Sequence, residues 1–147
     1  MDGKKYDALK LENQLCFPLY AAARQVVKQY HALLDAIGLT YTQYITMMVM
    51  WEHREISVKA LGERLFLDSG TMTPVLKSLE SKGYVTRKRS PVDERSVTVT
   101  VTEEGEKLRD AAADIPSKVA RCVSLEPAEA EQLYALLYRI LNTEKQQ

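Results

Sequence analysis

Cys16 is the residue of this chain whose type and position best fit a chemical role. Pro18 follows two residues later, and proline is tolerated in the first turn of a helix and disruptive further in. Either a regular helix begins close to Cys16, or an earlier helical segment kinks there. A helix start carries partial positive charge and free amides, which favour the thiolate, the reactive form of cysteine. The alternative is a structural role, because a lone cysteine on an apolar helix face is usually a small core residue.

Cys122 is the second thiol, and the two together exclude several kinds of site. Two cysteines argue against a disulfide framework and are too few for a zinc site, and His31 and His53 have no metal-ligand spacing relative to them. The sequence shows no phosphate-binding glycine loop and no serine triad signal. We therefore expect no metal, no cofactor and no catalytic site.

The length and composition of the chain suit one globular domain, or one domain with dimerisation arms. The chain has 147 residues, 46% of them hydrophobic, and a net charge of zero,. No apolar run approaches the roughly 18 residues that a membrane span needs, and the first residues lack the apolar stretch of a signal peptide. These features predict a cytoplasmic protein with no membrane partner.

Helical periodicity covers the first part of the chain. Apolar residues recur every three or four positions from Leu11 to Ile37, which predicts a long amphipathic helix that ends near Gly38,. Thr40 to Gln43 has the pattern of a capping box, with the Thr40 hydroxyl and the Gln43 side chain each bonding the other residue's amide. Three further helices are expected at Thr42–Glu52, Val58–Leu65 and Gly70–Lys82, and the last two form a helix-turn-helix.

After Gly83 the apolar period changes from 3.6 to 2. Strands are predicted at Tyr84–Arg89 and Ser96–Val101, joined by a polar turn, and helices follow from Thr102 and from Pro127,. This order predicts a mainly α fold with a small β-hairpin wing, that is, a winged helix-turn-helix with N- and C-terminal dimerisation helices. We expect dimerisation helices at about 8–37 and 103–144 and a DNA-binding lobe at about 40–102 of a homodimer.

The charge distribution fits such a lobe. The stretch from Lys82 to Arg95 holds five basic residues against two acidic ones, although a solvated basic turn would look the same,. The second helix of the helix-turn-helix would enter the major groove of double-stranded DNA, and the wing would contact the backbone or the minor groove. Asp93 could hold Arg95 in an extended pose, or could be an ordinary turn residue. The predicted DNA-binding residues are Ser69, Thr71, Thr73, Pro74, Lys77, Arg87, Lys88, Arg89, Asp93 and Arg95.

Three segments resemble the MarR family of transcriptional regulators over nearly the whole chain. They are Leu39–Tyr44, Asp68–Leu76 and the wing Ser90–Ser96, whose Asp93-x-Arg95 pattern is typical of that family. The stretch Lys10–Phe17 resembles the organic hydroperoxide resistance repressors (OhrR) within it. The resemblance implies a repressor that binds a pseudo-palindromic operator and releases it when an organic hydroperoxide oxidises a cysteine.

The resemblance also assigns roles to residues. Cys16 matches the peroxide sensor, Tyr30 and Tyr41 match tyrosines that hydrogen-bond to its sulfur, and Tyr20 matches another aromatic near it. Phenol hydroxyls can stabilise a thiolate, and Leu15, Phe17 and Leu19 would favour organic over inorganic peroxides. By default, Tyr30 and Tyr41 would be plain core or interface aromatics.

Three questions stay open on the sequence. Some family members carry a second cysteine in a late helix, which condenses with the oxidised sensor of the other subunit, and Cys122 lies close to the corresponding position in the sequence. Without such a role for Cys122, a small thiol would condense with the oxidised sensor. A regulator that responds to a small aromatic ligand would have the same fold, with Cys16 incidental. A thiol peroxidase would share the reactive cysteine, but the wing would then have no purpose.

Overall fold

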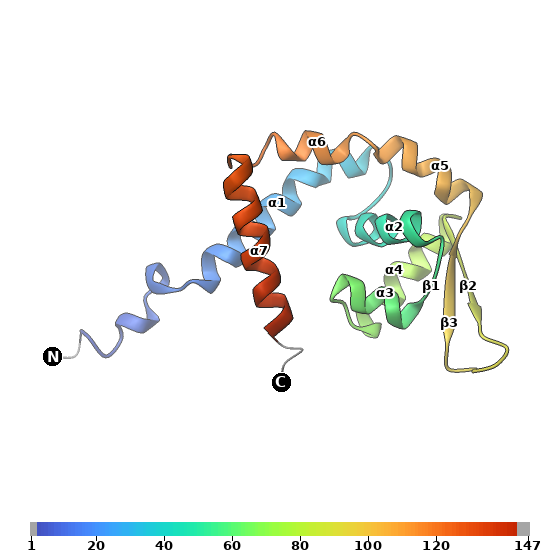
Figure 1. The fold of residues 1–147 in the computed structure, drawn as a ribbon, viewed down its shortest axis with the longest axis horizontal. Coiled ribbons are helices and arrows are strands. Elements are labelled where there is room, and N and C mark those ends of the chain that lie inside the picture. Colours follow the sequence, from blue (N-terminus) through green and yellow to red (C-terminus); the bar gives the residue numbers. More distant parts are fainter. Residues whose placement is uncertain (1–2, 144–147) are drawn as a thin grey trace.

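The computed structural model describes residues 3–143, so the predicted end of the last dimerisation helix, at 144, lies outside the described residues. The helices and strands follow the predicted order apart from one additional strand at Glu55–Ser57 (Figure 1). The elements are η1 (Asp7–Leu9), η2 (Leu11–Asn13), α1 (Cys16–Asp35), α2 (Tyr41–His53), β1 (Glu55–Ser57), α3 (Val58–Leu65), α4 (Ser69–Ser81), β2 (Val85–Arg89), β3 (Val97–Val101), α5 (Glu103–Ala112), α6 (Ile115–Ala120) and α7 (Pro127–Thr143).

Local capping fixes where the helices of the lobe begin. The predicted capping box is present, since the Gln43 amide donates to Thr40 Oγ1 (3.3 Å) and the Thr40 amide donates to Gln43 Oε1 (3.1 Å). Asp68, rather than Ser69, caps α4 by accepting from the Thr71 amide at 2.8 Å,. Gly83, just after α4, has a positive φ, which is typical of a glycine that ends a helix,.

The wing is a three-stranded antiparallel sheet in the order β1-β3-β2, which corrects the predicted two-stranded hairpin. Ile56 of β1 and Arg87 of β2 both pair with Val99 of β3. Sequence patterning missed β1 because three residues are too few to establish an alternation. The extra strand attaches the wing directly to the start of the helix-turn-helix.

The core of the lobe lies among α2, α3, α4 and the sheet. Met47, Met50, Leu61 and Met72 are fully buried, whereas Met48 of α2 is 44% exposed. Since α2 packs against α1, α3, α4, α5 and β3, its buried surface is wider than one stripe,.

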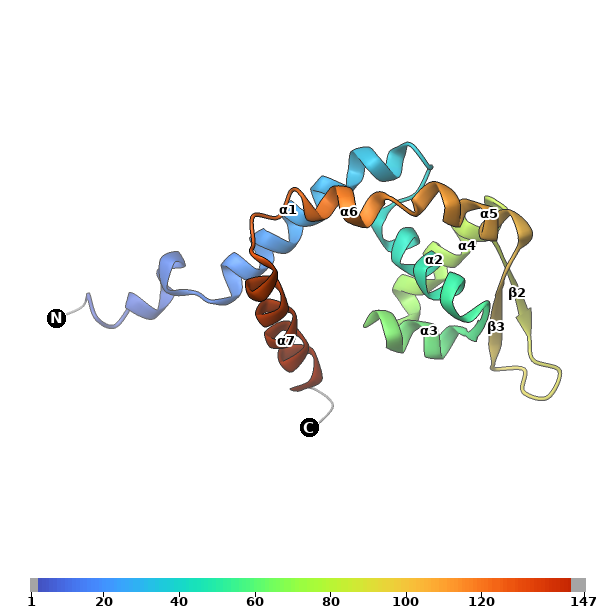
Figure 2. The same ribbon diagram turned by 45° about the horizontal axis from the view of Figure 1, so that its top comes forward.

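The N-terminal segment, α1 and α7 extend away from the lobe, while α5 and α6 run back from the wing toward α1 (Figures 1 and 2). Ile115 and Val119 of α6 are buried in the same core cluster as Leu34 of α1. In contrast, α7 buries none of its residues, although its apolar side chains cover much of its circumference. The exposed apolar side chains of these arms include Leu11, Leu15, Phe17, Leu19, Val26, Leu133, Tyr134, Leu136, Tyr138, Ile140 and Leu141.

Candidate functional site

Cys16 is the first residue of α1, so the structure agrees with the first of the two interpretations of Pro18. Its side chain is exposed, and no side chain caps the helix start. The preceding turns are held by side-chain amides, with Asn13 donating to the Asp7 carbonyl (2.7 Å) and Gln14 to the Lys10 carbonyl (3.1 Å). The sulfur therefore lies at a fixed helix start whose free amides can stabilise negative charge.

Apolar side chains surround this position. Leu15 is 80% exposed, and Phe17 and Leu19 are also exposed. Tyr20 follows Cys16 by one helical turn and therefore lies on the same face of α1. Its hydroxyl accepts from Arg24 at 3.4 Å, and the Arg24 guanidinium lies 5.5 Å from its ring centroid.

The two predicted partner tyrosines form a cluster of their own. The Tyr30 ring lies 5.0 Å from the Tyr41 ring and 5.7 Å from the Tyr44 ring. Tyr30 and Cys16 are on the same helix, fourteen positions apart, which at the α-helical rise corresponds to about 21 Å. Cys16 cannot reach Tyr30 or Tyr41 of its own chain.

Burial changes the acid–base behaviour of the cluster. Desolvation raises the pKa of Tyr41, and desolvation together with the charge of a neighbouring phenolate raises the pKa values of Tyr30 and Tyr44. The hydroxyls consequently remain hydrogen-bond donors throughout the ordinary pH range.

This cluster should make the protein sensitive to alkali. Because the three pKa values lie above their ordinary value in the folded state, the unfolded chain loses these protons first. The free energy of unfolding should be insensitive to these groups below about pH 10 and fall as the pH rises beyond it. Urea unfolding between pH 8 and 11 should show the decline, and Tyr30→Phe should reduce it. An unchanged decline in Tyr30→Phe would contradict this account of the cluster.

Cys122 lies in the turn that follows α6, not in a helix as the resemblance implied. It is exposed, and its thiol donates to the Lys118 carbonyl at 3.6 Å. Both thiols are free in the chain. Among residues 3–143, no group of three or more His, Cys, Asp or Glu side chains is placed to hold a metal ion.

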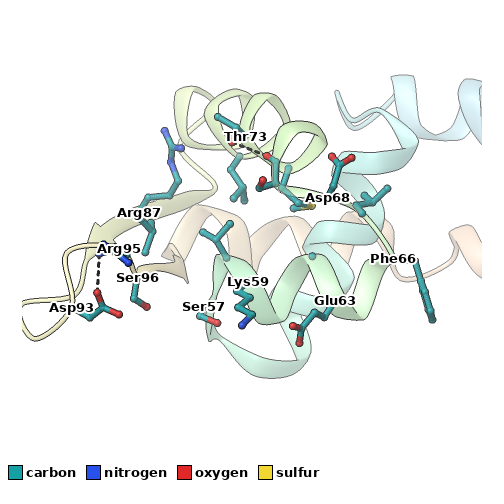
Figure 3. A pocket seen from close by; sticks show the side chains of 17 residues that line it. Ser57, Lys59, Glu63, Phe66, Asp68, Thr73, Arg87, Asp93, Arg95 and Ser96 are labelled. Atoms are coloured by element: carbon teal, nitrogen blue, oxygen red, sulfur yellow. Dashed lines mark hydrogen bonds between the residues drawn. The ribbon is translucent and has the colours of Figure 1, made fainter. Parts of the chain in front are cut away.

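The second region of interest is a hollow of about 1070 Å³ bounded by α3, the start of α4 and the wing (Figure 3). Of the predicted DNA-binding residues, five line it: Ser69, Thr73, Arg87, Asp93 and Arg95. The others are exposed outside it, with Thr71, Pro74 and Lys77 on α4 and Lys88 and Arg89 on β2. Patterning missed Ser57, Lys59 and Glu63, which line the hollow from α3 and its cap, because only the fold brings that helix to the wing.

Several of the predicted DNA-binding residues make internal bonds, among them Thr73, whose hydroxyl donates to the Ser69 carbonyl at 2.8 Å. Arg87 donates to the Glu80 carboxylate from its backbone amide (3.0 Å) and its guanidinium (3.3 Å), and these bonds lower the pKa of Glu80. Asp93 accepts from the backbone amide of Arg95 at 3.0 Å, as Figure 3 shows. Arg87 thus anchors the wing to α4, and Asp93 has the bonding of a turn residue. The guanidinium of Arg95 forms no ion pair with a described side chain.

Comparison with known proteins identifies the family. A family model described as the transcriptional regulator SarA/Rot matches residues 28–112. The organic hydroperoxide resistance transcriptional regulator of Bacillus subtilis is 48% identical over 139 residues, which cover 95% of each chain. The chain belongs to this family of transcriptional regulators. The resemblance seen in the sequence is confirmed, and the thiol peroxidase alternative is set aside because the family consists of regulators.

Solved structures of this regulator family share the fold. The reduced form of AbfR bound to DNA superposes with a TM-score of 0.78 at 30% identity, covering 99% of this chain and 98% of that one. A disulfide-formed AbfR has a TM-score of 0.65 at 31% identity, covering 96% and 99%; AbfR is a protein of Staphylococcus epidermidis. The predicted winged-helix fold is confirmed. None of the helices among residues 3–143 has the length and apolar character of a membrane span.

Proposed function

We propose that the protein is a homodimeric DNA-binding repressor that releases its operator when an organic hydroperoxide oxidises Cys16. The observation that carries this proposal is the exposed thiol at the start of α1, with a partly buried tyrosine cluster near the other end of that helix, formed by Tyr30 of α1 and by Tyr41 and Tyr44 of α2. The relative from Bacillus subtilis is named for organic hydroperoxide resistance, and AbfR is described in reduced and disulfide-formed states. As a regulator of transcription, the protein would act in the cytoplasm.

A second copy of the chain completes the site. Within residues 8–37 and 103–143, the arms carry apolar side chains that the lobe does not cover, and surfaces of this kind mark interfaces,. In a two-fold dimer with antiparallel α1 helices, Cys16 of one protomer lies near Tyr30 and Tyr41 of the other. Each dimer then has two sensor sites, and Tyr20 lies beside each.

The chemistry at the sensor is ordinary thiol oxidation. The Cys16 thiolate attacks one oxygen of the hydroperoxide, an S–O bond forms, the O–O bond breaks, and the alkoxide takes up a proton and leaves as the alcohol. The tyrosine hydroxyls donate to the anionic sulfur, and Leu15, Phe17 and Leu19 supply an apolar approach for the organic group. The sulfenic acid then condenses with a second thiol and loses water; that thiol is either Cys122 of the other protomer or a small thiol.

The lobe reads DNA with α4 and the wing. The hydroxyls and methyls exposed on α4 suit base edges of the major groove, and the exposed cations of the wing suit phosphates or the minor groove,. A dimer of such lobes requires a pseudo-palindromic operator with half-sites about one helical turn apart. The direct test is a gel shift on DNA upstream of the protein's own gene, with and without cumene hydroperoxide. Retention of the complex by the oxidised wild type would overturn the proposal.

Mixed dimers test whether the site is shared between protomers. One protomer would carry Cys16→Ser, and the other Tyr30→Phe with Tyr41→Phe. If the site is shared, this heterodimer keeps one complete site, because the remaining cysteine meets the intact tyrosines of the other chain. Its rate of oxidation per thiol should equal that of the wild type and exceed that of the Tyr30→Phe, Tyr41→Phe homodimer by about tenfold, the change expected from one charge-assisted hydrogen bond. Equal rates in the heterodimer and that homodimer would contradict a shared site.

A second candidate function is induction by a small aromatic ligand. A hollow of about 320 Å³ lies between α2 and the α5–α6 segment, lined by Tyr44, Met48, Trp51, Glu52, Arg109, Ala112, Ala113 and Pro116. Its rings and one cation suit an aromatic carboxylate. Such a regulator would still release DNA with its ligand when Cys16 is replaced by serine, whereas the peroxide sensor would become unresponsive.

A further inference from the structure

We propose that Gln43 is the positioning residue that transmits the state of the tyrosine cluster to α4. This inference rests on the proposed function, because it concerns how oxidation at the sensor reaches the DNA-reading helix. It is carried by a set of partly buried hydrogen bonds that helix capping alone does not require.

Gln43 lies in the first turn of α2 and is only 7% exposed. Its Oε1 atom accepts from the Thr40 amide at 3.1 Å and from Lys82 Nζ at 3.0 Å. Its Nε2 atom donates to Ser78 Oγ at 2.9 Å. A capping box needs only the bond to Thr40, so the bonds to Ser78 and Lys82 serve a different purpose.

These extra bonds join the two regions described above. Tyr41 precedes Gln43 by two residues and Tyr44 follows it directly, so the helical turn that carries Gln43 also carries two rings of the tyrosine cluster. Ser78 lies on α4, and Lys82, directly after α4, also donates to the Gly38 carbonyl in the loop between α1 and α2. Hydrogen bonds of Gln43 and Lys82 therefore connect three elements, namely the loop before α2, the start of α2 and the end of α4.

The directional hydrogen bonds of the buried Gln43 side chain make this connection rigid. Apolar contacts between two helices tolerate small sliding, but a buried amide that loses its partners carries a desolvation cost. When oxidation displaces Tyr41, the start of α2 can move only if α4 moves with it or the bonds of Gln43 break. Because Ser69 and Thr73 lie in the N-terminal half of α4, away from Ser78 in its C-terminal half, a small tilt about this connection would misplace these DNA-reading residues.

The chain offers matched variants that separate this connection from the cap. Gln43→Met removes every side-chain bond with little change of volume. Ser78→Ala removes the bond of Gln43 to α4 and leaves the capping box and the Lys82 bond intact, whereas Thr40→Ala removes the cap bond to the Gln43 amide and leaves both other bonds intact. Ser78 is half-buried, so its truncation is mild and serves if Gln43→Met fails to fold.

The experiment measures operator affinity by fluorescence anisotropy for the reduced protein and for the protein oxidised with cumene hydroperoxide. The ratio of the two dissociation constants reports the coupling, and thermal unfolding reports stability separately. Gln43→Met should lower this ratio by about tenfold, within the usual range of coupling between sites, and Ser78→Ala should lower it in the same direction. Both should keep the reduced-state affinity within about threefold of the wild type, as expected when no DNA contact is removed. Thr40→Ala should lose stability and keep the ratio.

A wild-type ratio in Ser78→Ala, and in Gln43→Met if it folds, would overturn the role of Gln43 while leaving the proposed function in place. A fall in the ratio of Thr40→Ala equal to that of Ser78→Ala would also overturn it, because general loosening of the lobe would then explain both. Failure of the oxidised wild-type protein to release DNA is a different result, and it would remove the proposed function together with this inference.

Discussion

Replacing Cys16 with serine should leave operator binding intact and abolish its loss on oxidation. Serine has nearly the volume of cysteine, and position 16 lies at the start of α1, well away from the hollow formed by α3, α4 and the wing (Figure 1). A serine hydroxyl is not ionised at neutral pH and does not attack a peroxide. We expect the reduced-state dissociation constant of the variant to stay within about twofold of the wild type, since no DNA contact changes.

The measurement is a gel shift titrated with cumene hydroperoxide, in which the wild-type complex should disappear and the Cys16→Ser complex should persist. Cys122→Ser is the matched control, because it removes the other exposed thiol. If Cys122 of the other protomer resolves the sulfenic acid, this control should lose the dimer-sized band on non-reducing gels. Release of DNA by oxidised Cys16→Ser would contradict the assignment of the sensor. Equal rates with hydrogen peroxide and cumene hydroperoxide would contradict only the preference for organic oxidants.

Arg95→Ala should give the largest loss of DNA affinity among the wing variants. Arg95 lines the hollow, its backbone amide is held by Asp93, and its guanidinium pairs with no described side chain, so it is free to meet DNA. One arginine that contacts base edges or the minor groove contributes about 1 to 3 kcal/mol, or about 5- to 150-fold in affinity. If it also neutralises a phosphate, the slope of log K against log salt should become shallower by about one.

Arg87→Ala is the informative comparison for Arg95→Ala. Arg87 is tied to Glu80 and anchors the wing, so its loss should weaken binding without changing the salt slope. Anisotropy titrations between 50 and 200 mM salt would measure both slopes. A shallower slope in Arg87→Ala would show that this guanidinium leaves Glu80 for the DNA backbone. An Arg95→Ala protein with wild-type affinity would contradict the role of the wing tip.

Local features explain why the DNA-binding lobe was predictable from the sequence. The capping box at Thr40, the Asp68 cap and the Gly83 turn each depend on residues within a few positions of one another. The strand β1 is too short to show a pattern. The exposure of Met48 depends on which elements pack around α2, and that information is distributed along the chain.

The residues of the proposed sensor could be named from the sequence, but their arrangement in space could not. Pro18 left two possible starts for α1, one of them near Cys16, and the resemblance supplied Tyr30 and Tyr41. Only the length of α1 shows that these residues are too far apart to meet within one chain. Gln43 also has partners that the local sequence does not reveal. Its pattern predicts a helix cap, but it also bonds to Ser78 of α4 and to Lys82 just after α4, more than thirty residues further along the chain.

The exposed apolar surface of α7 makes the stability of the protein depend on its concentration in the cell. A helix without a single buried side chain has no reason to stay folded in an isolated subunit, so subunit concentration enters its stability directly,. Dilution below the dimer dissociation constant would unfold the arms. The subunits would then lose both the shared sensor sites and the binding of two lobes to one operator. The amount of protein that a cell maintains therefore sets whether the regulator works at all, before any peroxide arrives.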